Sequence, residues 1–249
     1  MGRIMRIMCL LVLLAGGRAS AKDFYSDGNI ITGDLWDSVY IHDTLPSHTT
    51  INMTGGEVFG GMYGYDRSTL NLSGGRVNIM SSYDNSILNM TAGILNNLYS
   101  YEYSTANISG NTLDGPFNIS ARDNSIINFS GTADADHVDA FNTVKLNILG
   151  GTINHISARN DGVLNIYSGD ISNVWSQDNA VINVFGKELR KWPTGGAFGY
   201  GFVYGYYNDW SSFYFSLEST ESYSHVNLIP EPATILLLVA GSLFLRKKE

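Results

Sequence analysis

Carboxylate and amide side chains recur along this chain at intervals that could place them in one row. They stand five residues before a repeated asparagine, at Asp66, Asp84, Glu102, Asp123, Asn142, Asn160 and Asp178. Stacked carboxylates repel one another, and a hard cation such as Ca²⁺ would relieve that repulsion. The polar and small residues after each position favour a simpler interpretation, a turn in which the side chain bonds nearby backbone N–H groups. We therefore expect no cofactor and no metal site, with calcium at this acidic row as the alternative.

A second polar cluster, formed by Asp134, Asp136, His137 and Asp139, is the densest in the chain and falls where the spacing of the repeat is irregular. These residue types could bind a metal or a substrate. We favour a loop that replaces one apolar strand, because Asp134 occupies a position that is apolar in the other repeats.

Catalytic chemistry has little support in the sequence. Cleavage of a polysaccharide needs paired carboxylates, or Ca²⁺ with a basic residue, in one cleft. The arginines do not recur at one position from coil to coil, and no Gly-x-Ser-x-Gly, His-Glu-x-x-His or phosphate-loop motif occurs. No catalytic residue is therefore predicted. Exposed aromatic rings could stack on sugars, although ordinary strand positions also explain them; they are Tyr63, Tyr65, Tyr83, Tyr99, Tyr101, Tyr103 and Trp175.

An internal repeat must position all of these residues. Its centre is apolar–Asn–apolar followed by small or polar residues and Gly, with the asparagine at Asn52, Asn71, Asn89, Asn107, Asn128, Asn147, Asn165 and Asn183. The steps between them are 19, 18, 18, 21, 19, 18 and 18 residues. A unit this short cannot bury its apolar face alone, so successive units must stack. Stacked asparagine amides can hydrogen-bond along the axis, which predicts a structural ladder rather than a row of ligands.

The repeat predicts an all-β chain folded as a right-handed parallel β-helix of about eight coils of 18–21 residues. Neighbours in a strand point to opposite faces, so the apolar residues beside each asparagine face inward and the asparagine faces outward. Leu164 is expected inside, between Leu146 and Ile182. A left-handed hexapeptide helix is disfavoured because polar residues interrupt its six-residue period, as at Asp170.

The β-helix repeats are assigned to residues 49–186, between a cap at 22–48 and a second cap at 187–229. In the second cap Phe202, Tyr204 and Tyr206 alternate with small residues, and Phe213, Phe215 and Leu217 alternate farther on. This period of two predicts a β-hairpin with an aromatic face that closes the end of the stack.

The N-terminus resembles a secretory signal peptide over residues 1–21. Arg3 and Arg6 precede a short apolar segment, and Ala19 and Ala21 are small residues suited to signal peptidase before Lys22. The single cysteine, Cys9, lies in this segment. The apolar segment is far shorter than the roughly 20 residues that span a bilayer.

The C-terminal segment 230–249 begins with the triplet Pro230, Glu231 and Pro232. A 13-residue apolar run from Ala233 to Leu245 follows, and Arg246, Lys247 and Lys248 end it. The prolines favour extended backbone that a protease could bind, and the basic cluster would stay at the cytoplasmic face of a short transmembrane helix. The segment resembles the PEP-CTERM sorting tail of Gram-negative bacteria that make extracellular polysaccharide. That resemblance implies an exosortase that cleaves near the triplet; a retained membrane anchor is the alternative.

A chain running from Lys22 to Pro232 would keep 9 basic and 22 acidic residues, a net charge of −13. This acidity argues against nucleic acid as a partner, because phosphates would be repelled. We expect an exported structural or adhesive protein of the cell surface or extracellular matrix, without catalytic activity, anchored transiently in the inner membrane. Extracellular polysaccharide is a further candidate partner. The alternative is a carbohydrate-active enzyme, a polysaccharide lyase or glycosidase, or a glycan-binding protein on the same scaffold.

Overall fold

The computed structural model describes residues 19–43, 48–110, 117–193 and 200–230. Over these residues the chain is nearly all β and winds into a parallel β-solenoid of about nine turns, which confirms the predicted parallel β-helix. Its elements are β1 (Ala19–Phe24), β2 (Gly28–Ile30), β3 (Leu35–Ile41), β4 (Thr50–Gly64), β5 (Thr69–Ser82), β6 (Ile87–Met90), β7 (Ile94–Ser100), β8 (Thr105–Ile108), β9 (Phe117–Ala121), β10 (Ile126–Phe129), β11 (Asp134–Ala140), β12 (Lys145–Ala158), β13 (Val163–Ser176), β14 (Val181–Trp192), β15 (Gly201–Tyr206), β16 (Ser212–Leu217), α2 (Thr220–His225) and β17 (Val226–Pro230).

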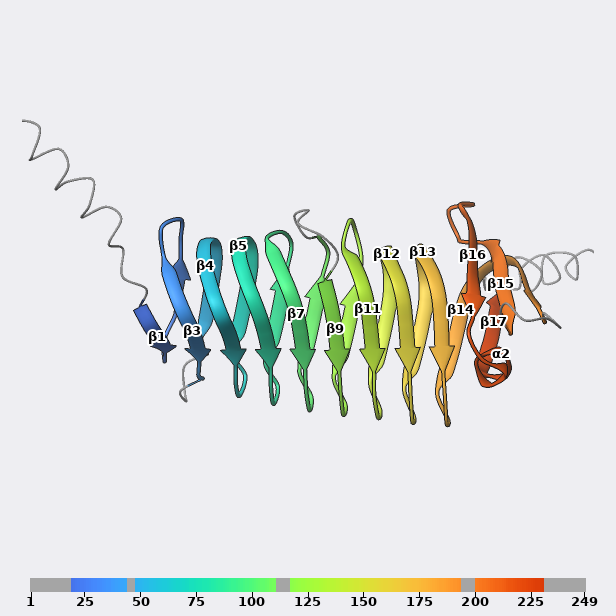
Figure 1. Cartoon of the computed structure of the whole chain (residues 1–249), viewed down its shortest axis with the longest axis horizontal. Coiled ribbons are helices and arrows are strands. Elements are labelled where there is room, and N and C mark those ends of the chain that lie inside the picture. Colours follow the sequence, from blue (N-terminus) through green and yellow to red (C-terminus); the bar gives the residue numbers. More distant parts are fainter. Residues whose placement is uncertain (1–18, 44–47, 111–116, 194–199, 231–249) are drawn as a thin grey trace, which may run out of the picture.

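The coils follow one another along the axis in chain order. In Figure 1 the nearer strands run downward while the chain advances from left to right, so the solenoid is right-handed. Successive coils pair in parallel with like residues in register: Asn71 lies beside Asn52 on one side and Asn89 on the other. Each short strand thereby satisfies its backbone hydrogen bonds through both neighbouring coils, because no coil could do so alone.

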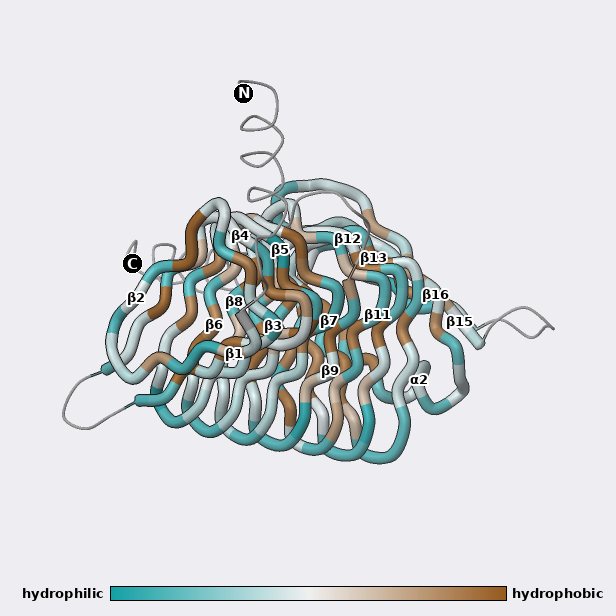
Figure 2. The backbone as a smooth tube through the Cα atoms, turned by 60° about the vertical axis from the view of Figure 1, so that its left-hand side comes forward, coloured by the Kyte–Doolittle hydropathy of each residue, from teal (hydrophilic) through white to brown (hydrophobic). Residues whose placement is uncertain are grey.

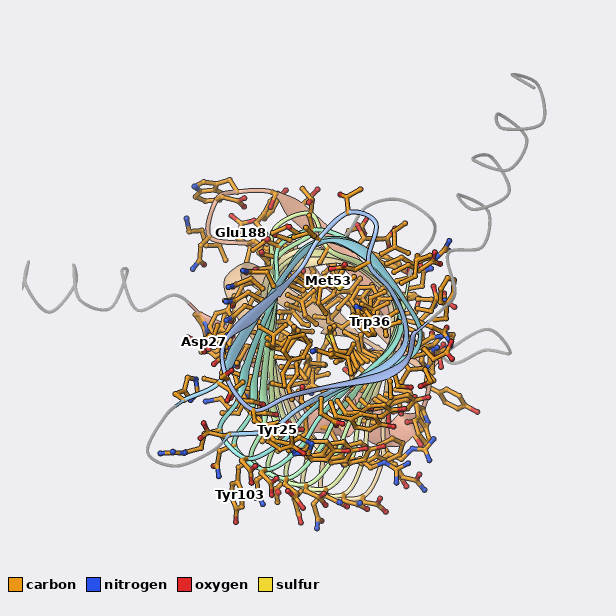
Figure 3. The ribbon with its side chains drawn as sticks, turned by 90° about the vertical axis from the view of Figure 1, so that its left-hand side faces the viewer. Tyr25, Asp27, Trp36, Met53, Tyr103 and Glu188 are labelled. Atoms are coloured by element: carbon orange, nitrogen blue, oxygen red, sulfur yellow. The ribbon has the colours of Figure 1, made fainter. Side chains whose placement is uncertain are left out.

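The core is a continuous apolar column enclosed by the coils. Leu164 has no exposed surface and lies between Leu146 and Ile182, as predicted from its place beside the repeat asparagine. The hydrophobic segments recur from coil to coil (Figure 2). A view along the axis shows Met53 inside the coil and Tyr103 pointing away from it (Figure 3). Side-chain alternation in each strand therefore separates an apolar interior from a polar exterior.

Glycines form the corner that follows each asparagine strand. Gly75 and Gly151 both have a φ of 85°, in the left-handed region that favours glycine. A Cβ on Gly151 would lie 2.6 Å from the carbonyl oxygen of Ala133 in the preceding coil, and one on Gly75 would lie 2.6 Å from that of Gly55. The recurring glycine thus meets both a backbone requirement and a close approach between coils.

The irregular segment at 134–140 is a strand rather than a loop, which corrects the sequence interpretation. β11 pairs in parallel with β9 and β12, and Ala135, Val138 and Ala140 point into the core. Ala135, not Asp134, lies opposite the buried Ile153. The segment between Asn128 and β11 is one residue longer than in the next coil. The inward-facing position therefore falls on Ala135, and Asp134 lies outside the apolar column. One coil earlier, the buried Phe117 occupies this position.

The N-terminal segment forms a further coil where a cap was expected. β2 pairs with β4 and places Asn29 beside Asn52, while β3 pairs with the second half of β4. β1 adds a strand to β3, through pairs that include Ala21 with Ser38 and Lys22 with Val39. The solenoid therefore begins about one repeat earlier than position 49.

The C-terminal segment contains the predicted hairpin. β15 and β16 pair antiparallel from Gly201 with Leu217 to Tyr206 with Ser212, and β15 also pairs with the second half of β14. β17 returns to pair with β14 in parallel and places Asn227 beside Asn183. α2 lies at the same end of the stack (Figure 1). Within the described part of the chain, no helix is both long and apolar enough to cross a membrane; the short helix predicted at 233–245 lies outside it.

Candidate functional site

The repeat asparagines form one hydrogen-bonded ladder along the outer face. The side-chain amide nitrogen of each donates to Oδ1 of the asparagine one coil earlier, at 2.8–2.9 Å for the links from Asn71 to Asn183. Asn52 extends the ladder to Asn29 at 3.5 Å, and Asn227 extends it to Asn183 at 3.1 Å. Donor and acceptor of each inner amide are therefore engaged by its neighbours, so this row offers little to a ligand.

The acidic and amide turn residues also bond one another from coil to coil. All seven adopt positive φ, between 54° and 63°. The carboxylate of Asp84 accepts the backbone N–H of Asp66 at 3.1 Å, and that of Glu102 accepts the N–H of Asp84 at 2.8 Å. Asp178 accepts the N–H of Asn160 at 3.3 Å in the same way. Three of the five carboxylates in the row thus bond the turn of the coil before them, whereas the sequence predicted bonds within each turn. Asp123 instead accepts from the side chain of Asn142 at 2.9 Å.

Most of the tyrosines singled out in the sequence stack on one another. Tyr65, Tyr83 and Tyr101 continue a column that begins with Tyr25 and His42, with centroids 5.0–5.1 Å apart and planes within 14° of parallel. Tyr63 stacks on Tyr40 at 5.0 Å. Arg159 lies over Trp175 at 4.4 Å. Because rings lie on both faces of Tyr65 and Tyr83, these two tyrosines present edges to solvent and cannot stack broadly on sugar rings. Tyr103 is 64% exposed at a turn.

Partial burial changes the acidity of these phenols. Desolvation raises the pKa of Tyr65 and Tyr101, and the neighbouring Tyr83 raises both further. The neutral form of Tyr65 and Tyr101 is therefore favoured to higher pH than that of a free tyrosine.

The polar residues of β11 form a small network on the outer face. Asn154 donates to Oδ1 of Asp136 at 3.0 Å, and Nδ1 of His137 lies 3.1 Å from its other oxygen. These hydrogen bonds hold the pKa of Asp136 below its usual value. His155 lies 5.1 Å from the His137 ring and 3.4 Å from Oε1 of Glu218, the residue after β16. Among the described residues, no three His, Asp or Glu side chains gather closely enough to hold a metal ion.

A shallow hollow of about 280 Å³ lies over β7, β9 and β11. Ser120 is small, so the larger side chains of Tyr99 and Asp139 stand on either side of it, and Arg122 lines one edge. Asn97 and Asn118 also line it. Arg122 and Asp139 thus line a common hollow. A second hollow, of about 430 Å³, is lined by Arg67 together with Asp43, Asp66 and Asp84.

The exposed rings gather instead at the C-terminal end, on the outer face of the sheet formed by β14, β15 and β16. Trp192 lies opposite Phe202, and Tyr204 lies opposite Tyr214. Trp192 is 62% exposed, Tyr214 56% and Tyr206 38%. We call this surface the aromatic platform; it comprises Trp192, Phe202, Tyr204, Tyr206 and Tyr214, with Glu188, Arg190, Ser212 and Ser216 between and beside them.

Two local features orient the platform outward. The small residues Gly201, Val203 and Gly205 of β15 are buried, which leaves the alternating aromatic side chains on the opposite face. Glu188 adopts a φ of 49° at a bulge, where the register of β14 with β15 shifts. Such a bulge re-aims the strand that follows it. Figure 3 shows Glu188 outside the solenoid, on a different side of the cross-section from Tyr103.

A larger groove of about 680 Å³ lies beside the platform, between β13 and β16. The two strands pair only at Asn173 with Ser216 and Val174 with Leu217, so their other halves diverge. Asp170 and Tyr207 line the groove, and Tyr214 borders both the groove and the platform.

The sequence located the residues of the hairpin but not their direction. The alternation of large and small residues predicts two faces but not which of them is buried. On β15 the glycine and valine face is buried and the aromatic face is exposed, whereas on β16 Phe215 and Leu217 turn inward. The signal that could have shown it is the pair of glycines, since Gly201 and Gly205 leave no room for side chains: a Cβ on Gly205 would lie 3.0 Å from Leu189.

The predicted processing residues lie at the edges of the described chain. Ala19 and Ala21 belong to β1, and Pro230 is the last residue of β17. Glu231, Pro232, Arg246, Lys247 and Lys248 lie outside the described residues, so the sorting tail stays a prediction from sequence. The chain matches no protein-family model, no curated protein and no solved structure.

Proposed function

We propose that the chain is an exported structural or adhesive protein of the cell surface or extracellular matrix, and that it acts without catalysis. The observation that carries this proposal is the contrast between the two parts of its exterior. Along the solenoid, asparagines, turn residues and rings bond to their counterparts in the next coil. At the C-terminal end, aromatic side chains remain exposed. Such a molecule is a stiff spacer with a contact surface at one end.

The two ends of the described fold are compatible with the proposed processing. The predicted sorting triplet starts at Pro230, where β17 ends. Cleavage after Ala21 would remove the first half of β1 and leave Lys22, Asp23 and Phe24 paired with β3. Both cuts would fall at the margins of the solenoid, so its coils would stay intact.

Intact-mass analysis of the protein recovered from the surface fraction of its own cell tests this proposal. A chain that begins near Lys22 and ends near Pro232 is expected. A surface chain that still ends in Arg246, Lys247, Lys248 and Glu249 would favour a retained anchor, and recovery only from the cytoplasm would refute export.

The hollow over β7, β9 and β11 supports a second candidate function, a carbohydrate-active enzyme. Arg122 and Asp139 line it together with Tyr99. Glycosidases use two carboxylates at one bond, whereas Asp139 is the one carboxylate that lines this hollow in the described chain. Reducing-end and unsaturated-product assays on acidic and neutral glycans, repeated with Asp139→Asn, decide between the two functions. Turnover that is abolished by this substitution would replace the structural proposal.

A further inference from the structure

The aromatic platform differs from the solenoid in gathering several exposed rings on one surface, whereas an exposed ring such as Tyr103 lies at a turn away from it. Trp192 and Tyr214 are each more than half exposed, and a planar side chain with that much exposed surface keeps at least one face toward solvent. Phe202 and Tyr214 touch at an interplanar angle of 36°, unlike the near-parallel rings of the solenoid column. These rings are thus available for contact where the column rings are not.

The spacing of the rings suits a long ligand rather than a compact one. Phe202, Tyr204 and Tyr206 follow one another on one face of β15, so neighbouring rings are about 6.6 Å apart along the strand. Tyr214 and Trp192 lie on the strands to either side. The platform is therefore a ribbon of rings across three strands, without the enclosed cavity that a small molecule would require.

The polar groups of the platform favour a hydroxylated ligand over a lipid surface. Between the rings stand Arg190, Glu188 and Ser212, and three of the rings are tyrosines that carry hydroxyl groups. Among the described residues on this face no aliphatic side chain occurs, whereas a segment that enters a membrane uses apolar side chains to do so. Sugar rings offer apolar C–H faces to the aromatics and hydroxyl groups to the polar residues.

The distribution of charge adds a preference for acidic sugars. Residues 22–186 carry 6 basic and 17 acidic side chains, a net charge of −11. Residues 187–229 carry three basic and four acidic side chains, a net charge of −1. An anionic chain would therefore be repelled along the solenoid and much less at the platform, where the exposed Arg190 offers a cation. Asp170 lines the adjoining groove, so the same electrostatics keeps such a chain on the platform and out of that groove.

From these observations we infer that the aromatic platform binds an acidic polysaccharide, with the rings of Trp192 and Tyr214 on the sugar faces and Arg190 on the acidic groups. The inference rests on the proposed surface function and names the ligand class of its contact surface.

Binding measurements on the full-length chain test the inference, with the chain kept soluble by a polyoxyethylene detergent that carries no sugar. The probes are alginate as a polyuronate, dextran as a neutral polysaccharide, and vesicles of phosphatidylglycerol and phosphatidylcholine. Trp192→Ala and Tyr214→Ala should each weaken alginate binding about three- to tenfold, as expected for the loss of one aromatic contact. Tyr103→Ala removes an equally exposed tyrosine from a distant turn and should leave the affinity unchanged.

The Arg190→Gln variant distinguishes the contribution of the positive charge to binding from that of the aromatic rings. It should weaken alginate binding and reduce its dependence on salt, because one ion pair with a carboxylate is lost. Dextran should bind more weakly than alginate to the unaltered chain. Melting temperatures of all variants, measured in parallel, identify any variant that has lost its fold.

The inference fails if folded Trp192→Ala and Tyr214→Ala variants bind alginate as the unaltered chain does, or if Tyr103→Ala weakens binding equally. Dextran binding as tight as alginate binding would refute the acidic preference, and binding to vesicles alone would assign the platform to a membrane. These results are independent of where the cell sends the chain, so failure of export and failure of polysaccharide binding are distinguishable.

Discussion

Tyr207 is a buried side chain at the turn between β15 and β16, and its hydroxyl has no hydrogen-bond partner in the described chain. Its ring stacks on Phe213 with centroids 4.3 Å apart, so the ring contributes to packing while the hydroxyl is desolvated without compensation. Desolvation, aided by Asp170 and Asp209, raises the pKa of Tyr207 strongly.

We expect Tyr207→Phe to stabilise the fold by about 1 kcal/mol, because it removes an unpaired buried hydroxyl and keeps the ring. The raised pKa means that the folded state resists ionisation, so stability that is complete below the unfolded pKa of about 10 is lost as the pH rises above it. Denaturant unfolding between pH 7 and pH 11 should show a flatter alkaline decline for the variant. A variant less stable than the parent at pH 7 would mean that the hydroxyl has a partner.

Leu164 and Asn165 are neighbours on opposite faces of β13. Leu164 is fully buried, so Leu164→Asp places an unpaired carboxylate in the core and should cost roughly 3–5 kcal/mol. Asn165 donates to Asn147 and accepts from Asn183. Asn165→Asp loses the donor and places a charged oxygen, on a side chain that is 6% exposed, against Oδ1 of Asn147, so it should cost about 1–3 kcal/mol, less than Leu164→Asp. Thermal melts of the two variants provide the comparison, and the reverse order would contradict the inner and outer faces described above.

At the scale of the coil, the corner glycines set how closely successive units approach. Gly33 and Gly151 make a matched pair, since both have positive φ but only Gly151 is crowded. Gly33→Ala should cost about 1–2 kcal/mol from backbone strain alone. Gly151→Ala should cost more, because its Cβ would meet the carbonyl oxygen of Ala133 at 2.6 Å. Equal losses in urea unfolding would show that inter-coil contact adds nothing at this corner.

The carboxylates of the acidic turns determine how much Ca²⁺ should raise the melting temperature. One oxygen of Asp84, Glu102 or Asp178 already accepts a backbone N–H, which leaves the other for a cation. We expect millimolar Ca²⁺ to raise the melting temperature by only a few degrees, through preferential binding to the folded state. Mg²⁺ serves as the control for ionic strength. A chain that unfolds on addition of a chelator would show that the row is a required calcium site.

Over the whole molecule, stability is distributed among nearest-neighbour contacts between coils, so shortening one end should have a small effect. Removal of residues 1–21 takes Ala19 and Ala21 from β1 and keeps the pairs of Lys22, Asp23 and Phe24. The processed chain should therefore melt within a few degrees of the complete one. A loss of cooperative unfolding after this cut would mean that the first coil nucleates the stack.

The sequence by itself determined the repeat, its inward and outward positions and the parallel stacking. The reason is that alternation along a strand and a step of about 18 residues leave few other ways to bury the apolar residues on either side of each asparagine, such as Leu164 beside Asn165. It also located the turns of the acidic row, because Asp and Asn tolerate the left-handed backbone that these turns adopt. It did not show that the carboxylates bond the neighbouring coil, 18 residues away.

Only the tertiary structure decided which side chains remain available to contact a ligand. Tyr83 and Tyr214 are alike in sequence terms, yet the first has rings on both faces and the second is 56% exposed. That difference depends on which residue the next coil places opposite, and on the burial of Gly201 and Gly205 that turns the aromatic face of β15 outward. The one-residue shift before Ala135 likewise follows from pairing with β12 rather than from local pattern. Such contacts join residues far apart in the chain, which is why spacing alone could not reveal the platform.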